Sequence, residues 1–191
     1  GVADLITARQ ALDLAVQVDS SIKTVGILYD SNCPFGTGYV DALKAACAEL
    51  EIAVVEGNPA GKDQVAEAMK ELCGQVDAVF SPMDSTVSAA AQEAAKAARE
   101  AGKPWYAASE DAVAAGALAS INIDYTDAGN KAADMAVQLV SGKTVEELAV
   151  YAYLNGRVSV NQETMDALAL HFPEEVLEEA NYIKAQKSEE T

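Results

Sequence analysis

Residues 23–29 have the sequence KTVGILY, in which apolar and β-branched residues follow one another without a polar face. A continuous run of this kind is typical of a strand covered on both faces, as in a parallel sheet. Helical spacing flanks it, because apolar side chains recur at intervals of three and four over 8–18 and again over 39–50. The pattern predicts a buried strand between two helices.

The same alternation continues along the chain. Strand-like runs are expected at 52–56, 77–80, 105–107 and 117–123, with helices over 65–72 and from an N-cap at Ser85 or Thr86 to Ala101. Strands separated by helices favour right-handed crossovers and a parallel sheet. We therefore predict an α/β fold with a Rossmann-like, doubly wound parallel sheet of order 2-1-3-4-5, counted from residues 23–29.

The regular alternation ends after Tyr125. A helix is expected from 126 to about 141, followed by extended runs at 148–154 and 157–160, with Asn155-Gly156 as a two-residue hairpin turn between them. Two short helices should follow, one capped by Asn161 and one opened by Pro173.

The chain is acidic, with 13 Lys and Arg against 30 Asp and Glu and a net charge of −17. Such a field repels phosphate groups, so nucleic acid and anionic lipid are excluded as partners, whereas a cationic or zwitterionic ligand is not. No stretch is long and apolar enough to span a bilayer.

Familiar catalytic and metal-binding patterns are missing. Cys33, Cys47 and Cys73 show no C-x-x-C spacing, and His171 is the single histidine, so no zinc site or Cys-His pair is predicted. There is no G-x-S-x-G elbow and no phosphate-binding loop, and Gly36-Thr37-Gly38 lacks the third glycine of a dinucleotide site. We expect no cofactor and no enzymatic activity.

Small polar and acidic residues gather in turns directly after four of the expected strands. Because ligands bind at the carboxyl ends of parallel strands, these turns should share one edge of the sheet. The turns are 29–36, 81–86, 109–111 and 122–125.

The chemistry of these turns suits a zwitterion. Carboxylates at Asp84, Glu110, Asp111 and Asp124 can hold an ammonium group, and hydroxyls with helix N-terminal amides can hold a carboxylate. For Asp84 and Asp111 a simple helix-capping role is an equally good interpretation.

Larger apolar residues lie at or beside the same strand ends. Phe35, Met83, Trp105 and Tyr125 could form the apolar half of a pocket, although for Trp105 a place in the core is favoured.

Several of these segments together resemble the ABC transporter substrate-binding family that includes tryptophan- and tyrosine-binding lipoproteins. The resemblance spans residues 1 to about 179. It is carried by 24–29 (TVGILY), 76–87 (VDAVFSPMDSTV), 109–119 (SEDAVAAGALA) and 123–129 (IDYTDAG).

The resemblance implies a type I periplasmic binding fold, in which two Rossmann-like lobes joined by a multi-strand hinge clamp a small ligand, here an amino acid and preferably an aromatic one. It implies an extracytoplasmic protein with a lipid anchor and an ABC permease as partner. Another lobe would precede Gly1, residues 1–125 would form the ligand-binding lobe, and residues 126–191 would form the crossover helix, hinge strands and terminal helices, returning toward that other lobe.

The same resemblance assigns ligand contacts where motifs match. Residues 33–36 (CPFG) depart from the usual small, polar form of the first loop, which affects that loop's contacts. The contacts implied are Ser31, Asn32, Asp84, Ser85, Thr86, Ser109, Glu110 and Asp124.

Two other function classes share the expected fold, since a fold does not fix a function. A flavodoxin-like receiver domain needs an aspartate after its third strand, where Asp84 lies, but also paired acidic residues after the first strand, which are missing. The effector domain of a sugar-responsive transcription factor would favour hydroxyl partners and aromatic stacking.

An exposed apolar face is expected on the helix that follows Tyr125. Ala132, Met135, Ala136 and Leu139 share that face, and exposed apolar stripes tend to self-associate. We therefore predict a homodimer or a disordered tail for this chain.

Overall fold

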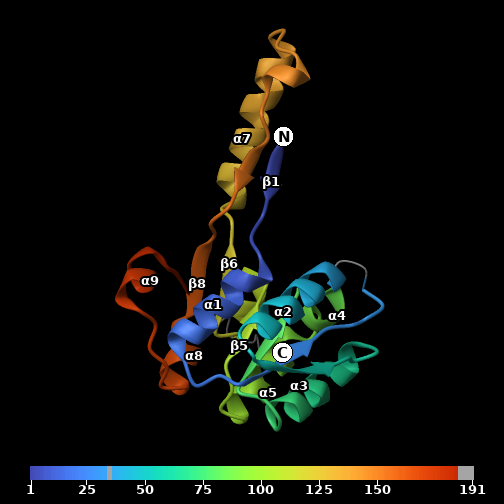
Figure 1. The fold of residues 1–191 in the computed structure, drawn as a ribbon, viewed down its shortest axis with the longest axis vertical. Helices are drawn as coiled ribbons and strands as arrows, with labels where there is room; N and C mark the ends of the chain where they lie inside the picture. Colours follow the sequence, from blue (N-terminus) through green and yellow to red (C-terminus); the bar gives the residue numbers. More distant parts are fainter. Residues whose placement is uncertain (34–35, 185–191) are drawn as a thin grey trace, which may run out of the picture.

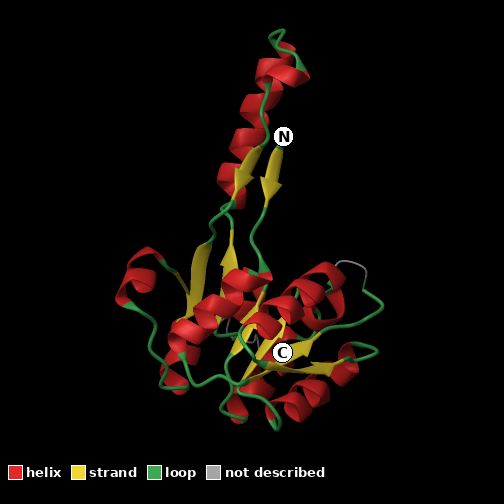
Figure 2. Ribbon diagram, viewed as in Figure 1, coloured by secondary structure: helices red, strands yellow, loops and turns green. Residues whose placement is uncertain are grey.

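The computed structural model describes residues 1–33 and 36–184. Helices and strands alternate through most of the chain (Figures 1 and 2). The strands are β1 (Val2–Asp4), β2 (Thr24–Leu28), β3 (Ala53–Gly57), β4 (Ala78–Ser81), β5 (Trp105–Ala107), β6 (Ala119–Asn122), β7 (Tyr151–Tyr153), β8 (Arg157–Asn161) and β9 (Asn181–Ile183). The α-helices are α1 (Ala8–Val18), α2 (Thr37–Glu49), α3 (Val65–Cys73), α4 (Ser85–Ser88), α5 (Ala91–Glu100), α6 (Glu110–Ala115), α7 (Tyr125–Val140), α8 (Gln162–Ala167) and α9 (Glu174–Glu179), and short 3-10 turns lie at η1 (Lys62–Gln64) and η2 (Val145–Glu147).

The main sheet has the order β3-β2-β4-β5-β6-β8-β9. Its first five strands run parallel, which confirms the predicted order of the strands that begin near residues 24, 53, 78, 105 and 119. β8 then pairs antiparallel with β6, and β9 pairs parallel with β8. The doubly wound α/β architecture is thus confirmed, with two strands of opposite direction added at one edge.

Apolar side chains cover both faces of this sheet. One buried cluster joins α1 and α2 to alternate residues of the strands, such as Ile27, Phe80 and Tyr106. The other joins α3, α5 and α6 to their neighbours on the opposite face, such as Leu28, Val79 and Trp105. This alternation explains why residues 25–28 carry no polar side chain, since each face of the strand meets a helical layer. We call this three-layer unit the lobe; it consists of the sheet of β2–β6, β8 and β9 with helices on both faces.

A second unit extends away from the lobe, and we call it the arm (Figure 1). It consists of residues 1–4 and 125–153, in which β1 pairs parallel with β7 beside α7. The Tyr153 hydroxyl donates to Asp127 of α7 at 2.5 Å, and the Lys131 ammonium lies 5.2 Å from the ring centre of Tyr151. No residue of α7 is buried, although the helix is 16 residues long.

The expected hairpin at Asn155-Gly156 is wrong. The preceding strand, β7, pairs with β1, and the following strand, β8, pairs with β6, so the two belong to different sheets. A two-residue turn of the Asn-Gly kind needs positive φ at both positions. Neither Asn155 nor Gly156 has a positive φ.

The helix expected from Ser85 or Thr86 to Ala101 is two helices, α4 and α5. Ala90 leaves the helical region with φ −129° and ψ 29°, which allows both Val87 and Ala90 to be buried in the same cluster. Its expected N-cap is also wrong, because Asp84 caps α4. The caps expected at Asn161 and Pro173 are confirmed.

Candidate functional site

A cavity of about 200 Å³ opens at the carboxyl edge of the parallel strands. β5 and β6 contribute their last residues, and the segments after β4 and β6 contribute larger side chains. The chain that enters from β1 and the first turns of α1 and α2 close the cavity. The lining residues are Asp4, Ile6, Thr7, Ala11, Tyr39, Met83, Ala107, Ala108, Ile121, Asn122 and Tyr125.

Two of the four residues expected to form an apolar pocket line this cavity. Met83 and Tyr125 are 57% and 60% exposed, which leaves them available to a ligand. Trp105 is instead buried in the core at 1% exposure, where its indole N–H donates to the Ser81 hydroxyl at 2.9 Å. Phe35 lies outside the described residues.

Asp84 connects two of the loops at this edge. One carboxylate oxygen accepts the Val87 amide at 2.9 Å and so caps α4, and the other accepts the Asp30 amide at 2.8 Å from the loop after β2. The residue is 2% exposed. Both oxygens are therefore engaged within the protein, in keeping with the capping interpretation of this aspartate.

Asp30 completes the same connection from the opposite side. Its carboxylate accepts the backbone and side-chain amides of Asn32 at 2.9 and 3.0 Å and the Thr86 hydroxyl at 2.9 Å. These bonds favour the charged form and lower the pKa of Asp30, the Asn32 backbone amide acting most strongly. We call the reciprocal bonding of Asp30 and Asp84 the loop clasp.

The other expected contacts on these two loops differ in whether their side chains already form hydrogen bonds within the protein. The exposed Ser31 exchanges hydrogen bonds with Asn58, and the Asn32 and Thr86 side chains are held by Asp30. The Ser85 side chain is exposed beside them. The structure thus brings Ser31, Asn32, Asp84, Ser85 and Thr86 together around the loop clasp, next to rather than within the cavity wall.

The expected contacts after β5 and β6 are placed differently. Ser109 caps α6 by accepting the Ala112 amide at 3.3 Å. Glu110 accepts hydrogen bonds from Ser159 of β8 and, at 3.4 Å, from Asn181 at the start of β9. Asp124 caps α7 through one oxygen, which accepts the Thr126 and Asp127 amides at 2.8 and 2.9 Å.

Four polar wall residues were not among the expected contacts, namely Asp4, Thr7, Tyr39 and Asn122. Asn122 is 7% exposed and donates from its side chain to Ser120 at 2.7 Å, while Asp4 accepts the Ile6 amide at 3.0 Å. Burial and the negative charge of Asp4 raise the pKa of Tyr125. Burial likewise raises the pKa of Tyr39. Both phenols are therefore neutral at physiological pH and can donate a hydrogen bond.

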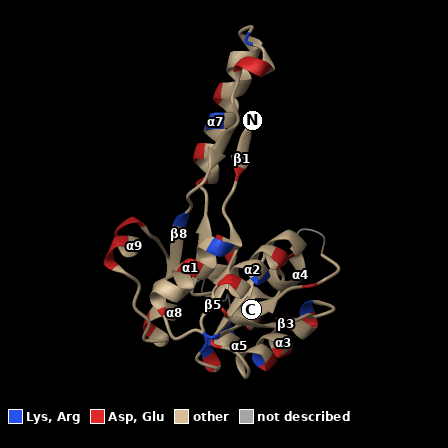
Figure 3. Cartoon of the chain, viewed as in Figure 1, with Lys and Arg blue, Asp and Glu red and all other residues tan. Residues whose placement is uncertain are grey.

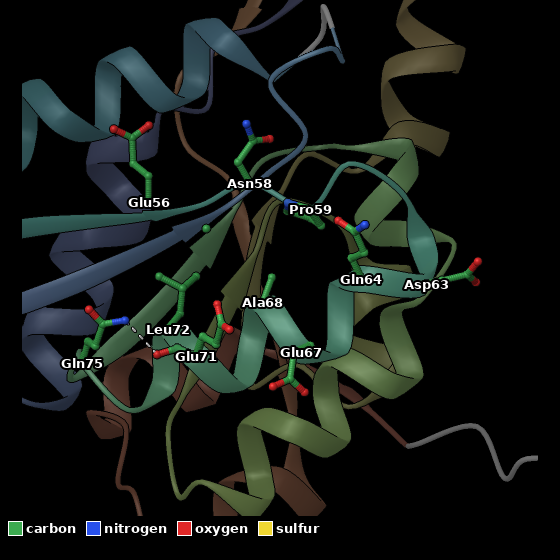
Figure 4. Close-up of a pocket in the computed structure, with 11 residues that line it drawn as sticks. Glu56, Asn58, Pro59, Asp63, Gln64, Glu67, Ala68, Glu71, Leu72 and Gln75 are labelled. Carbon is green, nitrogen blue, oxygen red and sulfur yellow. Dashed lines mark hydrogen bonds between the residues drawn. The ribbon is translucent and has the colours of Figure 1, made fainter.

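A separate cavity of about 390 Å³ lies between β3, η1 and α3 (Figure 4). Its walls carry four carboxylates together with amide groups, and it shares no residue with the cavity beside Tyr125. The carboxylates belong to Glu56, Asp63, Glu67 and Glu71. Acidic residues are spread over the lobe and the arm rather than concentrated there (Figure 3).

No group of three or more His, Cys, Asp or Glu side chains within 1–33 and 36–184 is arranged to hold a metal ion. Over the same ranges, none of the helices combines the length and apolarity needed to cross a membrane.

Comparison with known proteins identifies relatives of this chain. A curated tyrosine-binding protein from Clostridioides difficile is 27% identical over 168 residues, which is 88% of this chain and 49% of that protein. Among solved structures, the ligand-free, open form of a substrate-binding protein with adhesive properties from Clostridium difficile is 28% identical, with a TM-score of 0.87 over 97% of this chain and 62% of that one. An ABC domain from Streptococcus pneumonia, solved in complex with L-Trp, is 27% identical, with a TM-score of 0.79 over 96% of this chain and 62% of that one.

These relatives agree with the geometry of the lobe. The chain spans about half the length of the curated relative that it matches and 62% of the two solved chains. The neighbouring folds are type I periplasmic-binding-like domains, and members of the matching family are binding proteins rather than enzymes. Because the model of the ABC transporter substrate binding protein family matches residues 1–184, the chain belongs to that family.

Proposed function

We propose that this chain acts outside the cytoplasm as part of the solute-binding component of an ABC importer. Its ligand is a small zwitterionic amino acid, preferably an aromatic one. The observation that carries this proposal is the cavity at the carboxyl edge, where the exposed side chains of Met83 and Tyr125 stand beside Asn122 and Asp4. Relatives whose names or structures record tyrosine and L-Trp binding support the same ligand class.

The cavity wall combines the two features that such a ligand requires. Met83, Ile121 and Tyr125 offer apolar surface to a side chain, and aromatic rings and thioethers pack favourably against other aromatic groups. Asp4 supplies a negative charge for the ammonium group, and the amide of Asn122 supplies a polar contact. The ligand is thus oriented by polar groups at one end and held by apolar groups at the other.

The expected contact residues take two roles in this proposal. Ser31, Ser85 and Asp124 are exposed, and in this proposal they contact the ligand from outside the cavity wall. Asp84, Thr86, Asn32, Ser109 and Glu110 hold the loops in place, because their side chains are engaged within the protein.

The longer relatives favour a clamp made of two lobes. In this proposal residues 1–125 provide the cavity wall, residues 126–153 provide most of the arm, the residues after them add the edge strands β8 and β9, and a second lobe closes over the ligand. A lipid anchor and an ABC permease complete the system. A receiver domain is disfavoured because both oxygens of Asp84 accept backbone amides, which leaves no free carboxylate for phosphorylation.

The proposal is tested by calorimetric titration of the full-length gene product with L-tryptophan, L-tyrosine and D-ribose. We expect an aromatic amino acid to bind and Tyr125→Ala to weaken that binding about tenfold or more, as is usual for a central aromatic contact. Tyr182→Ala is the matched control, since Tyr182 is 48% exposed on β9 and does not line the cavity. Binding of D-ribose alone, or equal affinities for both variants, would contradict the assignment.

A further inference from the structure

Three short segments connect the lobe to the arm: residues 5–7, 123–124 and 154–156 (Figure 1). Hydrogen bonds tie the first segment to the end of β7 and the third segment to α1. The Leu5 amide donates to the Tyr153 carbonyl at 3.0 Å, and the Gln10 side chain donates to the Leu154 carbonyl at 2.9 Å. The first and third segments therefore lie side by side up to Leu154.

The third segment changes its partner at Gly156. Before it, β7 follows β1 as far as the pair of Asp4 and Tyr153. After it, β8 follows β6 from the pair of Asn122 and Arg157. Gly156 therefore stands at the point where the chain leaves the sheet of the arm and joins the sheet of the lobe.

Gly156 also packs against the first segment and against the end of β6, the strand that leads into the second segment. A Cβ atom at this position would lie 2.5 Å from Cγ2 of Ile121, 3.0 Å from Cδ1 of Ile6 and 3.1 Å from the Asn122 carbonyl. The contact with Ile121 is closer than packing allows, the other two are tighter than ordinary contacts, and the φ of Gly156 is not positive. The glycine is required here by lack of space rather than by backbone conformation.

The packing around Gly156 also involves the candidate ligand site. Ile6, Ile121 and Asn122, which surround Gly156, all line the cavity beside Tyr125. A change in the angle between the arm and the lobe must shift these residues against Gly156, because packed side chains cannot interpenetrate. The position of the arm and the shape of the cavity wall are thereby linked through one contact.

We propose that Gly156 is a positioning residue for ligand binding. It lets the first and third connecting segments pack directly on each other and on the end of β6, so that movement of the arm is transmitted to the Ile6 and Ile121 walls of the cavity. This inference rests on the proposed function, but Gly156 itself does not line the cavity.

The first test measures amide hydrogen exchange in Gly156→Ala without ligand. We expect faster exchange at 5–10, 121–124 and 153–158 together, because an added methyl group must separate these parts of the chain. Gly129→Ala is the matched control, since a Cβ atom at Gly129 of α7 has no other atom within 4 Å. Faster exchange confined to 153–158 would overturn the proposal.

The second test measures binding of L-tryptophan and L-tyrosine to the same variants. We expect Gly156→Ala to weaken binding about tenfold or more and Gly129→Ala to leave it within about twofold. In a double-mutant cycle, Ile121→Ala should cost less affinity in the Gly156→Ala background than in the parent protein, because it removes the clash. Additive losses, or unchanged affinity in Gly156→Ala, would overturn the proposal.

The two tests separate this inference from the function on which it rests. A parent protein that binds neither amino acid contradicts the proposed function, and the exchange pattern alone then decides whether Gly156 joins these parts of the chain. A parent protein that binds, together with exchange changes confined to one segment, contradicts only the role of Gly156.

Discussion

Asp30 illustrates how a single carboxylate at the edge of the sheet is committed to structure. Its three accepted hydrogen bonds favour the charged form and lower its pKa in the folded protein. Because the pKa is lower in the folded protein, the charged side chain contributes its full stabilisation at pH values above the pKa of the unfolded chain, which is about 3.9. That contribution is lost as the pH falls through the lower, folded-state value.

We therefore expect Asp30→Asn to lower the free energy of unfolding most at neutral pH. The difference from the parent protein should shrink as the pH falls below about 4, where the parent carboxylate becomes protonated. Urea unfolding between about pH 2.5 and 7 measures this, with the exposed Asp63→Asn as control. A difference that stays constant over this range would show that the charge of Asp30 has no part in it.

At the scale of elements, the stability of α7 depends on the hydrogen bonds at its ends, because none of its residues is buried. Asp124 accepts two amides of its first turn, and losing such a cap costs a helix about 1 kcal/mol. We expect Asp124→Ala to lower stability by about that amount. Asp134→Ala, in the middle of the same helix, should change it by less than about 0.5 kcal/mol. Chemical unfolding of both variants gives the comparison, and equal losses would contradict the capping role.

The strands that could be predicted from sequence are those whose own residue pattern indicates a buried strand. Residues 25–28 are apolar on both faces because both faces are covered, so the run is visible without any knowledge of its neighbours. β1 and β9 have three residues each, and such short strands are defined by the partner they meet. The hairpin at Asn155-Gly156 was wrong for the same reason, because the pairing of β7 with β1 outweighs a local turn signal.

The site was predictable to a similar extent. The turns after β2, β4, β5 and β6 do meet at one edge, and Met83 and Tyr125 line the cavity there. Asp4, Thr7 and Tyr39 were missed because none of them lies in a turn after a strand of the parallel sheet. They come from the end of β1, the start of α1 and the start of α2, and only the tertiary fold brings these parts to the cavity. For Asp84 the sequence left a ligand contact and a helix cap open, because both roles use the same residue type, and the structure shows the capping bond.

At the scale of the whole molecule, the arm leaves apolar surface uncovered. Val137 and Val140 are 64% and 90% exposed, and Leu139 is 40% exposed. Surfaces of this kind associate in water unless a partner covers them. The predicted helix face at Ala132, Met135, Ala136 and Leu139 belongs to this same helix.

We therefore expect these 191 residues, produced alone, to form a homodimer rather than a monomer of 19.9 kDa. Charge on the exposed face, as in Val137→Lys with Val140→Lys, should shift the equilibrium to monomer. Light scattering after size-exclusion chromatography measures both masses. A compact monomer over a wide concentration range would contradict the prediction, and Thr37→Lys on the lobe helix α2 controls for added charge alone.

The loop clasp has a consequence for engineering this protein. Asp30 and Asp84 come from loops 54 residues apart in the chain, yet each supplies a partner to the other's loop. A graft that replaces Asp30 alone leaves the Thr86 hydroxyl without its acceptor, and a graft that replaces Asp84 and Thr86 alone removes the acceptor of the Asp30 amide and one donor to the Asp30 carboxylate. Attempts to transplant ligand preference between relatives should therefore exchange both loops as a single cassette.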